Sequence, residues 1–243
     1  MSKAYKGKPC VYCAAVGVSS TPDHVVARAF FPPPDRKGLP IVPACESCNN
    51  EKSRIEHYLT TVMPFGGQHA SATETLQNTI PKLKKNMKLT AQLDASLKRK
   101  FVQKNGGPWE IAGEIELDGE KLTKLYEYIL RGLAFHHWGL LFDASHFLAA
   151  SYVTVEGASK FEEILQTHSC NSVEANLAHG GFVYRGIQSA ANSAFTVWRM
   201  SLYGAKVNGG TKDPGGKFKN AYGFTSPKSL LAGQLLSSLL TRN

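Results

Sequence analysis

The chain has 243 residues, of which 42% are hydrophobic, and its 28 lysines and arginines outnumber 19 aspartates and glutamates to give a formal net charge of +9. A chain of this length and apolar content can form a core, which excludes intrinsic disorder as its main state. No apolar run reaches the roughly 18 to 20 residues of a membrane span, and residues 1–8 lack the apolar segment of a signal peptide. We therefore expect a cytoplasmic protein with no membrane partner.

The positive charge is concentrated in one segment. Residues 82–104 carry eight lysines and arginines against one acidic residue, Asp94, for a net charge of +7, whereas residues 105–200 have a net charge of −5. A basic segment beside an acidic one predicts a contact surface for a polyanion such as nucleic acid. The alternative is an ordinary solvated helix that is rich in lysine.

A Pro-Phe-Gly-Gly stretch at residues 64–67 divides the first part of the chain. Residues 1–63 are dense in Cys, Pro, Asn and His, and we expect their last helix to end at this stretch, because proline and glycine interrupt helices. Beyond it, apolar residues recur three and four apart through residues 73–104. This spacing predicts helix, with a break at Pro81.

The second half of the chain contains both helix and strand patterns. Residues 122–133 have the period of an amphipathic helix, with charged residues opposite the leucines. Residues 194–207 alternate as a half-buried strand does, and residues 181–187 are its expected partner. The leucine-rich residues 229–240 are expected to form a docking helix.

These elements predict an α+β protein in three parts. Residues 1–65 form an N-terminal module, residues 66–108 a basic helical connector, and residues 109–243 a larger domain of helices and antiparallel strands. We expect this larger domain to bind DNA or to select the DNA site on which the protein acts. Aromatic and histidine side chains within it are expected in the core or at helix ends: Tyr184, Trp198, Tyr203, His136 and His137.

The cysteines give the most specific pattern in the sequence. Cys10 and Cys13 form one C-x2-C pair, and Cys45 and Cys48 form a second pair 31 residues further on. Four thiolates presented from two turns complete the tetrahedral shell of a structural zinc ion. A redox motif would account for one pair but not for two. Cys170 stands apart and is expected to be a small buried residue.

Polar residues between and after the cysteine pairs are suited to phosphodiester hydrolysis. Asp23 and Asn49 offer a carboxylate and an amide oxygen, which can hold one Mg²⁺ or Mn²⁺ ion. His24 has an ordinary pKa near 6.5, which suits a general base at neutral pH. Lys52 and Arg54 are candidates to contact a neighbouring phosphate.

The order C-x2-C, Asp-His, C-x2-C-Asn-x2-Lys over residues 10–58 resembles the HNH nuclease family. The resemblance implies a ββα-metal fold in which His24 is the general base and Asp23 and Asn49 are ligands of the catalytic metal. It also implies a structural zinc site of the four-cysteine type at Cys10, Cys13, Cys45 and Cys48. The sequence departs from the family where Pro40 stands in place of the middle asparagine, which normally organises the loop.

Several of these residues have alternative interpretations. His24 can be a structural histidine on a half-buried strand, and Asn49 can be the N-cap of the following helix. Arg28 is a further candidate to contact phosphate, or it is simply exposed. His57 is a secondary candidate for the metal or the phosphate, or it is a partly exposed helix residue.

Two classes of function fit these patterns. The first is a metal-dependent HNH endonuclease that cuts DNA, with RNA not excluded, and leaves, as the resemblance implies, a 5′-phosphate and a 3′-hydroxyl. Its setting would be bacterial or phage restriction, defence or DNA processing, and a double-strand break would need a homodimer or two visits. The alternative is a non-catalytic, zinc-dependent nucleic-acid-binding protein that retains the fold. In a further variant, the larger domain has its own enzymatic or partner-binding role.

Overall fold

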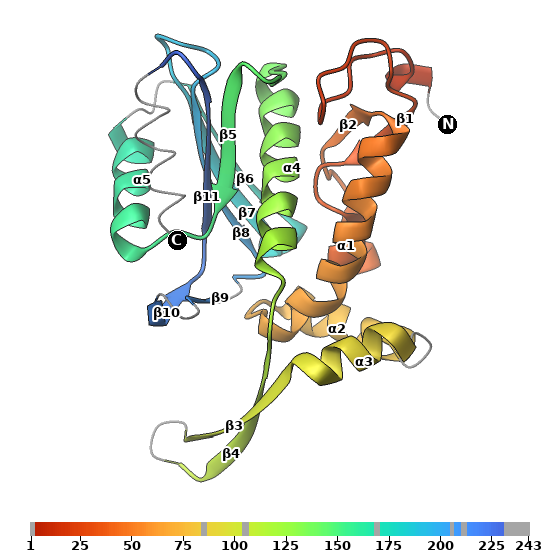
Figure 1. Ribbon diagram of the computed structural model, residues 1–243, viewed down its shortest axis with the longest axis vertical. Coiled ribbons are helices and arrows are strands. Elements are labelled where there is room, and N and C mark those ends of the chain that lie inside the picture. The colour runs from red at the N-terminus through yellow and green to blue at the C-terminus, as the bar shows by residue number, and fades with distance from the viewer. Residues whose placement is uncertain are drawn as a thin grey trace.

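The structure is a computed structural model of mixed α+β architecture, as predicted (Figure 1). It describes residues 3–83, 87–103, 107–167, 171–204, 207–209 and 213–230. A five-stranded sheet has one long helix on each face, and the N-terminal module packs on the outer side of one of these helices. Within the described residues, no helix is long and apolar enough to cross a membrane.

The N-terminal module consists of two short strands and a helix. Strands β1 (Thr21–His24) and β2 (Ile41–Ala44) pair antiparallel, and α1 (Glu46–Gly66) follows directly. A two-stranded ribbon tolerates Pro22 opposite Pro43, because its outer edges need no ladder hydrogen bonds. Short 3-10 helices lie before and between the strands: η1 (Lys3–Tyr5), η2 (Arg28–Phe30) and η3 (Pro33–Arg36).

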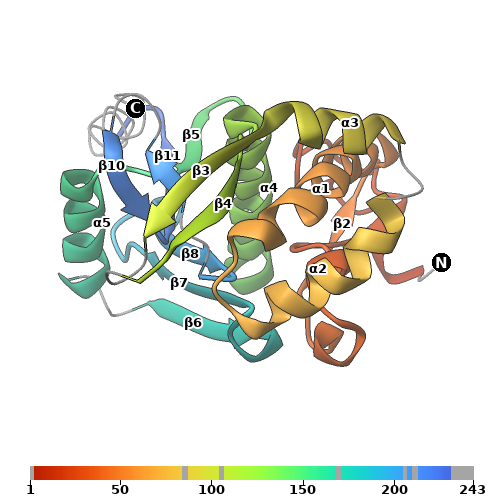
Figure 2. The same ribbon diagram turned by 90° about the horizontal axis from the view of Figure 1, so that it is seen from below.

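The connector differs from the prediction of a helical segment. Helices α2 (Ala70–Leu83) and α3 (Met87–Ser96) are present, but β3 (Leu97–Gln103) is a strand that pairs with β4 (Trp109–Ile115). The prediction of helix through residue 104 was therefore wrong from Leu97 on, because the pairing partner of this segment lies beyond the following turn. Figure 2 shows the hairpin as a two-stranded ribbon that extends across the lower end of the molecule.

The connector contains two helices, as predicted, with the break just beyond Pro81. This residue lies in the last turn of α2, which ends two residues later at Leu83, and α3 begins at Met87. A proline near a C-terminus removes only one of the last backbone hydrogen bonds, so the helix continues to its end. Pro64 likewise lies inside the last turn of α1.

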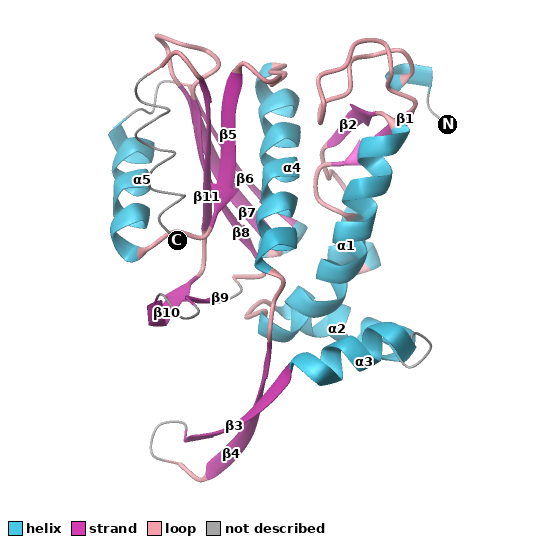
Figure 3. Cartoon of the chain, in the orientation of Figure 1, coloured by secondary structure: helices cyan, strands magenta, loops and turns pink. Residues whose placement is uncertain are grey.

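The larger part of the chain is built on one antiparallel sheet, in the order β5-β11-β8-β7-β6 (Figure 3). Its strands are β5 (His146–Ser151), β6 (Ser172–Leu177), β7 (Phe182–Gln188), β8 (Thr196–Leu202) and β11 (Ala221–Pro227). A separate two-stranded ribbon joins β9 (Val207–Gly209) to β10 (Asp213–Phe218). A short 3-10 helix, η4 (Ala178–Gly180), precedes β7.

Two helices cover the two faces of the sheet. Helix α4 (Gly119–Trp138) packs on the face that carries Trp198, Met200 and Leu202, and α5 (Val155–Thr167) packs on the face that carries Val197. The alternation of buried and partly exposed residues predicted for β8 is confirmed, and so is the pairing of β8 with β7. The amphipathic helix is also confirmed, between its N-cap Asp118 and a left-handed Gly139.

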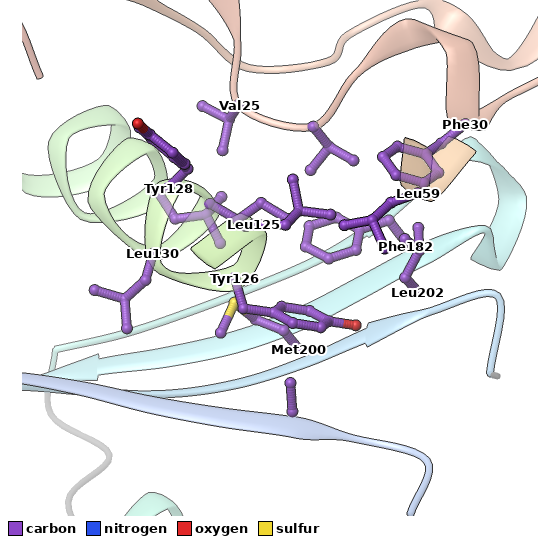
Figure 4. Packing of buried hydrophobic residues seen from close by; sticks show 14 of the residues in the cluster. Val25, Phe30, Leu59, Leu125, Tyr126, Tyr128, Leu130, Phe182, Met200 and Leu202 are labelled. Carbon is purple, nitrogen blue, oxygen red and sulfur yellow. The ribbon is translucent and has the colours of Figure 1, made fainter. Parts of the chain in front are cut away.

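One hydrophobic core runs from the N-terminal module to the sheet. Figure 4 shows Val25, Phe30 and Leu59 of the module packed with Leu125 of α4 and Leu202 of β8. All five side chains are fully buried. The three predicted parts are therefore distinct stretches of the sequence, but residues of the N-terminal module and of the larger domain share one apolar core.

Some predicted features lie outside the described residues. They are Cys170, three of the basic residues of the connector (Lys84, Lys85 and Lys104) and residues 231–240 of the expected C-terminal helix. The side chains of Lys82, Lys88, Arg99 and Lys100 are likewise not described.

Candidate metal centre and adjoining polar site

The four cysteines of the two C-x2-C pairs come together, and we call them the cysteine centre: Cys10, Cys13, Cys45 and Cys48. Their sulfur atoms all lie within 4.8 Å of one another, which is the arrangement needed to hold one metal ion. The second pair opens α1, because Cys45 is the N-cap of this helix. The first pair lies in a turn that Ala14 closes with a φ of 60°.

The electrostatics of the cysteine centre favour a bound cation. Burial, together with the neighbouring cysteines, raises the pKa of Cys13 and of Cys48. Burial also disfavours the thiolate of Cys10, but backbone N–H groups, including that of Cys45, outweigh it and lower the pKa of Cys10. Four sulfur atoms this close together can all be thiolates only with a positive ion between them, so binding of a metal would displace the thiol protons.

Asp23 lies at the end of β1 with only 9% of its surface exposed. One carboxylate oxygen, Oδ2, accepts a hydrogen bond from the Tyr12 hydroxyl at 2.5 Å and lies 2.9 Å from the Lys52 ammonium. The other oxygen, Oδ1, has no hydrogen-bond donor among the described residues. In the part of the chain that the structure describes, every side-chain N or O atom that is fully buried has a hydrogen-bond partner. Because Oδ1 has no such partner, it is not fully buried and keeps some contact with solvent.

Lys52 is fully buried, which corrects the prediction that it contacts a phosphate. Its ammonium group donates hydrogen bonds to the His24 carbonyl at 2.7 Å and to Glu56 Oε1 at 2.5 Å, and it forms an ion pair with Asp23 Oδ2 at 2.9 Å. Its charge is thus enclosed by protein groups, and full burial keeps it from a ligand. Lys52 is instead the counter-ion of two buried carboxylates.

Asn49 lies in the first turns of α1 with its amide fixed against β1. The Thr21 hydroxyl donates its one proton to the Ala44 carbonyl, so Asn49 must donate its amide Nδ2–H to Thr21 Oγ1, at 3.1 Å. The amide oxygen of Asn49 therefore points away from Thr21. The alternative role as N-cap does not apply, because Cys45 takes that position.

Thr21 and Asp23 point to the same face of β1, because side chains alternate along a strand. Asn49 and Lys52 are three residues apart and share one face of α1. The contacts of Thr21 with Asn49 and of Asp23 with Lys52 show that these two faces oppose each other. The structure thus brings together two of the predicted metal ligands.

His24 is half-buried and points to the other face of the strand. Burial is the main reason why the pKa of His24 is lowered, and the positive charges of Arg28 and Lys52 act in the same direction against Asp23. A neutral imidazole at neutral pH can accept a proton.

The outer face of α1 carries an open hollow of about 540 Å³, which is lined by Asn50, Ser53, Arg54 and His57. Ser53 and His57 follow Asn49 at steps of four residues, so the hollow begins beside Asn49 on the helix surface. Arg28 is also exposed, just after β1. Arg54, His57 and Arg28 are thus available to a ligand, in contrast to Lys52.

Two residues of this region were missed from the sequence. Tyr12 lies between the first two cysteines, and Glu56 lies one turn after Lys52, an i,i+4 pair that the sequence does contain. Burial raises the pKa of Glu56 to about 7, although Lys52 opposes this shift. We call the four side chains Tyr12, Asp23, Lys52 and Glu56 the carboxylate network.

The remaining candidates lie away from this region. Tyr184, Trp198 and Tyr203 are buried, as predicted for core residues. His137 contacts the Tyr184 hydroxyl at 2.8 Å, and burial lowers its pKa, so it is part of the core as predicted.

No protein-family model matches this chain, and neither a curated protein nor a solved structure does. The resemblance to HNH nucleases therefore rests on the sequence motifs of residues 10–58 alone.

Proposed function

We propose that the protein is a metal-dependent endonuclease of the HNH type, which hydrolyses phosphodiester bonds of DNA or RNA. One observation carries this proposal. Two strands and a helix are joined at a four-cysteine centre, and on them Asp23 and Asn49 lie on opposing faces of β1 and α1, with His24 following Asp23 at the end of the strand. A carboxylate and an amide oxygen for the metal, with a neutral imidazole on the adjoining residue, are the groups that metal-assisted hydrolysis of a phosphodiester uses.

The donor atoms fit the two metals that this function requires. Four sulfur ligands suit a structural Zn²⁺ ion at the cysteine centre. For the catalytic ion, the hydrogen bonds of these side chains use Asp23 Oδ2 and the Asn49 amide nitrogen, so we propose Asp23 Oδ1 and the Asn49 amide oxygen as ligands, and carboxylate and amide oxygens suit Mg²⁺ or Mn²⁺. When bound, such an ion would stabilise negative charge on the scissile phosphate and the leaving oxygen.

The remaining steps fall to residues of the chain itself. His24 accepts the proton of the attacking water, which its lowered pKa permits at neutral pH. Arg54, His57 and Arg28 are exposed near the site and bind neighbouring phosphates of the nucleic acid backbone. Strand β3 includes Lys98, Arg99 and Lys100 in its sequence, which we propose as further positive charge for a longer substrate, and Lys98 also pairs with Glu116.

A second candidate function is a non-catalytic, zinc-dependent nucleic-acid-binding protein. The pairing of Asp23 with the buried Lys52 favours it, because this ion pair holds the strand and helix together without any catalytic metal. The exposed basic residues would serve this function equally well.

The test is incubation of the zinc-loaded protein with supercoiled plasmid, single-stranded DNA and RNA in Mg²⁺, Mn²⁺ or EDTA. We expect cleavage that depends on the divalent ion and is lost in His24→Ala. His146→Ala is the matched control, since His146 opens β5, an edge strand of the five-stranded sheet and not part of the N-terminal module, and it should cut like the wild type. Binding of nucleic acid without cleavage of any substrate would favour the second candidate.

A further inference from the structure

We infer that Tyr12 and Lys52 are positioning residues, which fix the Asp23 carboxylate and connect the cysteine centre to the proposed catalytic site. This inference rests on the proposed function. It assigns roles to residues of the carboxylate network that touch neither substrate nor metal.

Tyr12 provides the connection to the cysteine centre. It lies in the four-residue turn between Cys10 and Cys13, so metal binding by these cysteines fixes the position of its backbone. Its ring is buried and packs edge-on against Tyr128 of α4, with 4.9 Å between ring centroids. Its hydroxyl reaches Asp23 Oδ2 at 2.5 Å. The phenol therefore has one fixed location, and that location determines where the carboxylate lies.

Lys52 fixes the same carboxylate from the side of the helix. Its ammonium group holds Asp23 Oδ2 and also the main-chain carbonyl of His24, the next residue. One side chain thus fixes the proposed metal ligand and the backbone of the proposed base relative to each other. Glu56 accepts a hydrogen bond from the ammonium group and holds it in place.

The hydrogen bond from Tyr12 and the ion pair with Lys52 determine which oxygen remains for a cation. Both act on Oδ2, so the carboxylate cannot rotate without losing two contacts in a buried environment, and Oδ1 is the oxygen left for a cation. Partners that orient a metal ligand in this way typically change metal affinity or activity by about 10- to 100-fold when they are removed.

Tyr12→Phe is the variant that tests this inference. It removes one oxygen atom and keeps the buried ring, and Lys52 still satisfies Asp23 Oδ2, so the fold should persist. Lys52→Met would leave two buried carboxylates without a counter-ion, so it is less suited to this purpose. Tyr184→Phe is the matched control, because it removes a buried hydroxyl that contacts His137 far from the site.

The measurements are zinc content, Mn²⁺ binding to the protein alone by electron paramagnetic resonance, and plasmid nicking as a function of Mn²⁺ concentration. We expect Tyr12→Phe to keep its zinc and to bind Mn²⁺ about tenfold more weakly, with the same shift in the Mn²⁺ concentration for half-maximal nicking. Tyr184→Phe should match the wild type in both.

The outcomes distinguish this inference from the function on which it rests. If the wild type binds Mn²⁺ and nicks plasmid, but Tyr12→Phe does so with unchanged Mn²⁺ dependence, the positioning role is overturned and the nuclease stands. If the wild type neither binds Mn²⁺ at this site nor nicks plasmid, the proposed function fails and the inference fails with it.

Discussion

At the scale of single residues, two buried carboxylates share one ammonium group beneath the proposed site. Asp23 and Glu56 are each about nine-tenths buried, and Lys52 is wholly buried between them. If one of these three charged side chains is removed, the buried charges that remain lose a partner, which lowers the stability of the fold.

Lys52→Met should therefore destabilise the protein by roughly 3–5 kcal/mol, because it leaves two buried carboxylates without their counter-ion. Urea denaturation gives the free energy of unfolding. Lys121→Met is the control: Lys121 pairs with Asp118 on the surface, so its loss should change the free energy by less than about 1 kcal/mol. A loss as small in Lys52→Met as in the control would show that the buried network contributes little.

The sequence predicted the site residues that belong to spaced motifs. The cysteine pairs are such a pattern, and the structure brings the four sulfur atoms together. The roles of Asp23, His24 and Asn49 remain predictions, although the structure ties Asn49 to Thr21 on the same strand as Asp23. The burial of Lys52 could not be predicted in this way, because a lysine after a zinc motif is equally common on a surface. Only the fold shows that Tyr12 and Glu56 surround it.

At the scale of elements, periodicity predicted the structure wherever one face of an element is buried by a neighbour. Helix α4 and strands β7 and β8 were predicted for this reason. Strand β3 was missed, because its seven residues pair with a strand that begins after an intervening turn. The apolar spacing within β3 and α3 does not distinguish helix from strand over so short a segment.

The contact between α4 and the N-terminal module depends on a glycine. A methyl group at Gly132 would lie 2.7 and 2.8 Å from the two Val25 methyl carbons. Gly132→Ala should therefore destabilise the protein by about 1–3 kcal/mol, although alanine favours helix. At Gly119, the first residue of the same helix, a methyl group meets no atom within 4 Å, so Gly119→Ala should be neutral or slightly stabilising.

Thermal or urea unfolding of the two glycine variants measures this difference. Equal stability of Gly132→Ala and Gly119→Ala would contradict the close packing of α4 against the module.

At the scale of the whole molecule, the continuous core couples the cysteine centre to the sheet. The three tryptophans, Trp109, Trp138 and Trp198, all lie outside the N-terminal module, so their fluorescence reports on the rest of the chain. Trp138 and Trp198 pack together, with 5.0 Å between ring centroids. Removing the metal from the cysteine centre should lower the urea midpoint that these tryptophans report, because metal binding contributes on the order of 10 kcal/mol to small zinc domains.

An unchanged tryptophan midpoint after chelation, with the metal shown to be absent by elemental analysis, would mean that the module unfolds separately. Finding no stoichiometric zinc in freshly purified protein would overturn the assignment of zinc to the cysteine centre.

We propose that His24 acts as a base in metal-dependent cleavage of nucleic acid. The most direct test is the rate at which zinc-loaded His24→Ala nicks supercoiled plasmid in Mn²⁺, with and without added imidazole. We predict a rate at least about 100-fold below that of the wild type, as expected for loss of a general base, and partial recovery when imidazole supplies the missing group. Nicking by His24→Ala at the wild-type rate, or no nicking by the wild type, would contradict the claim.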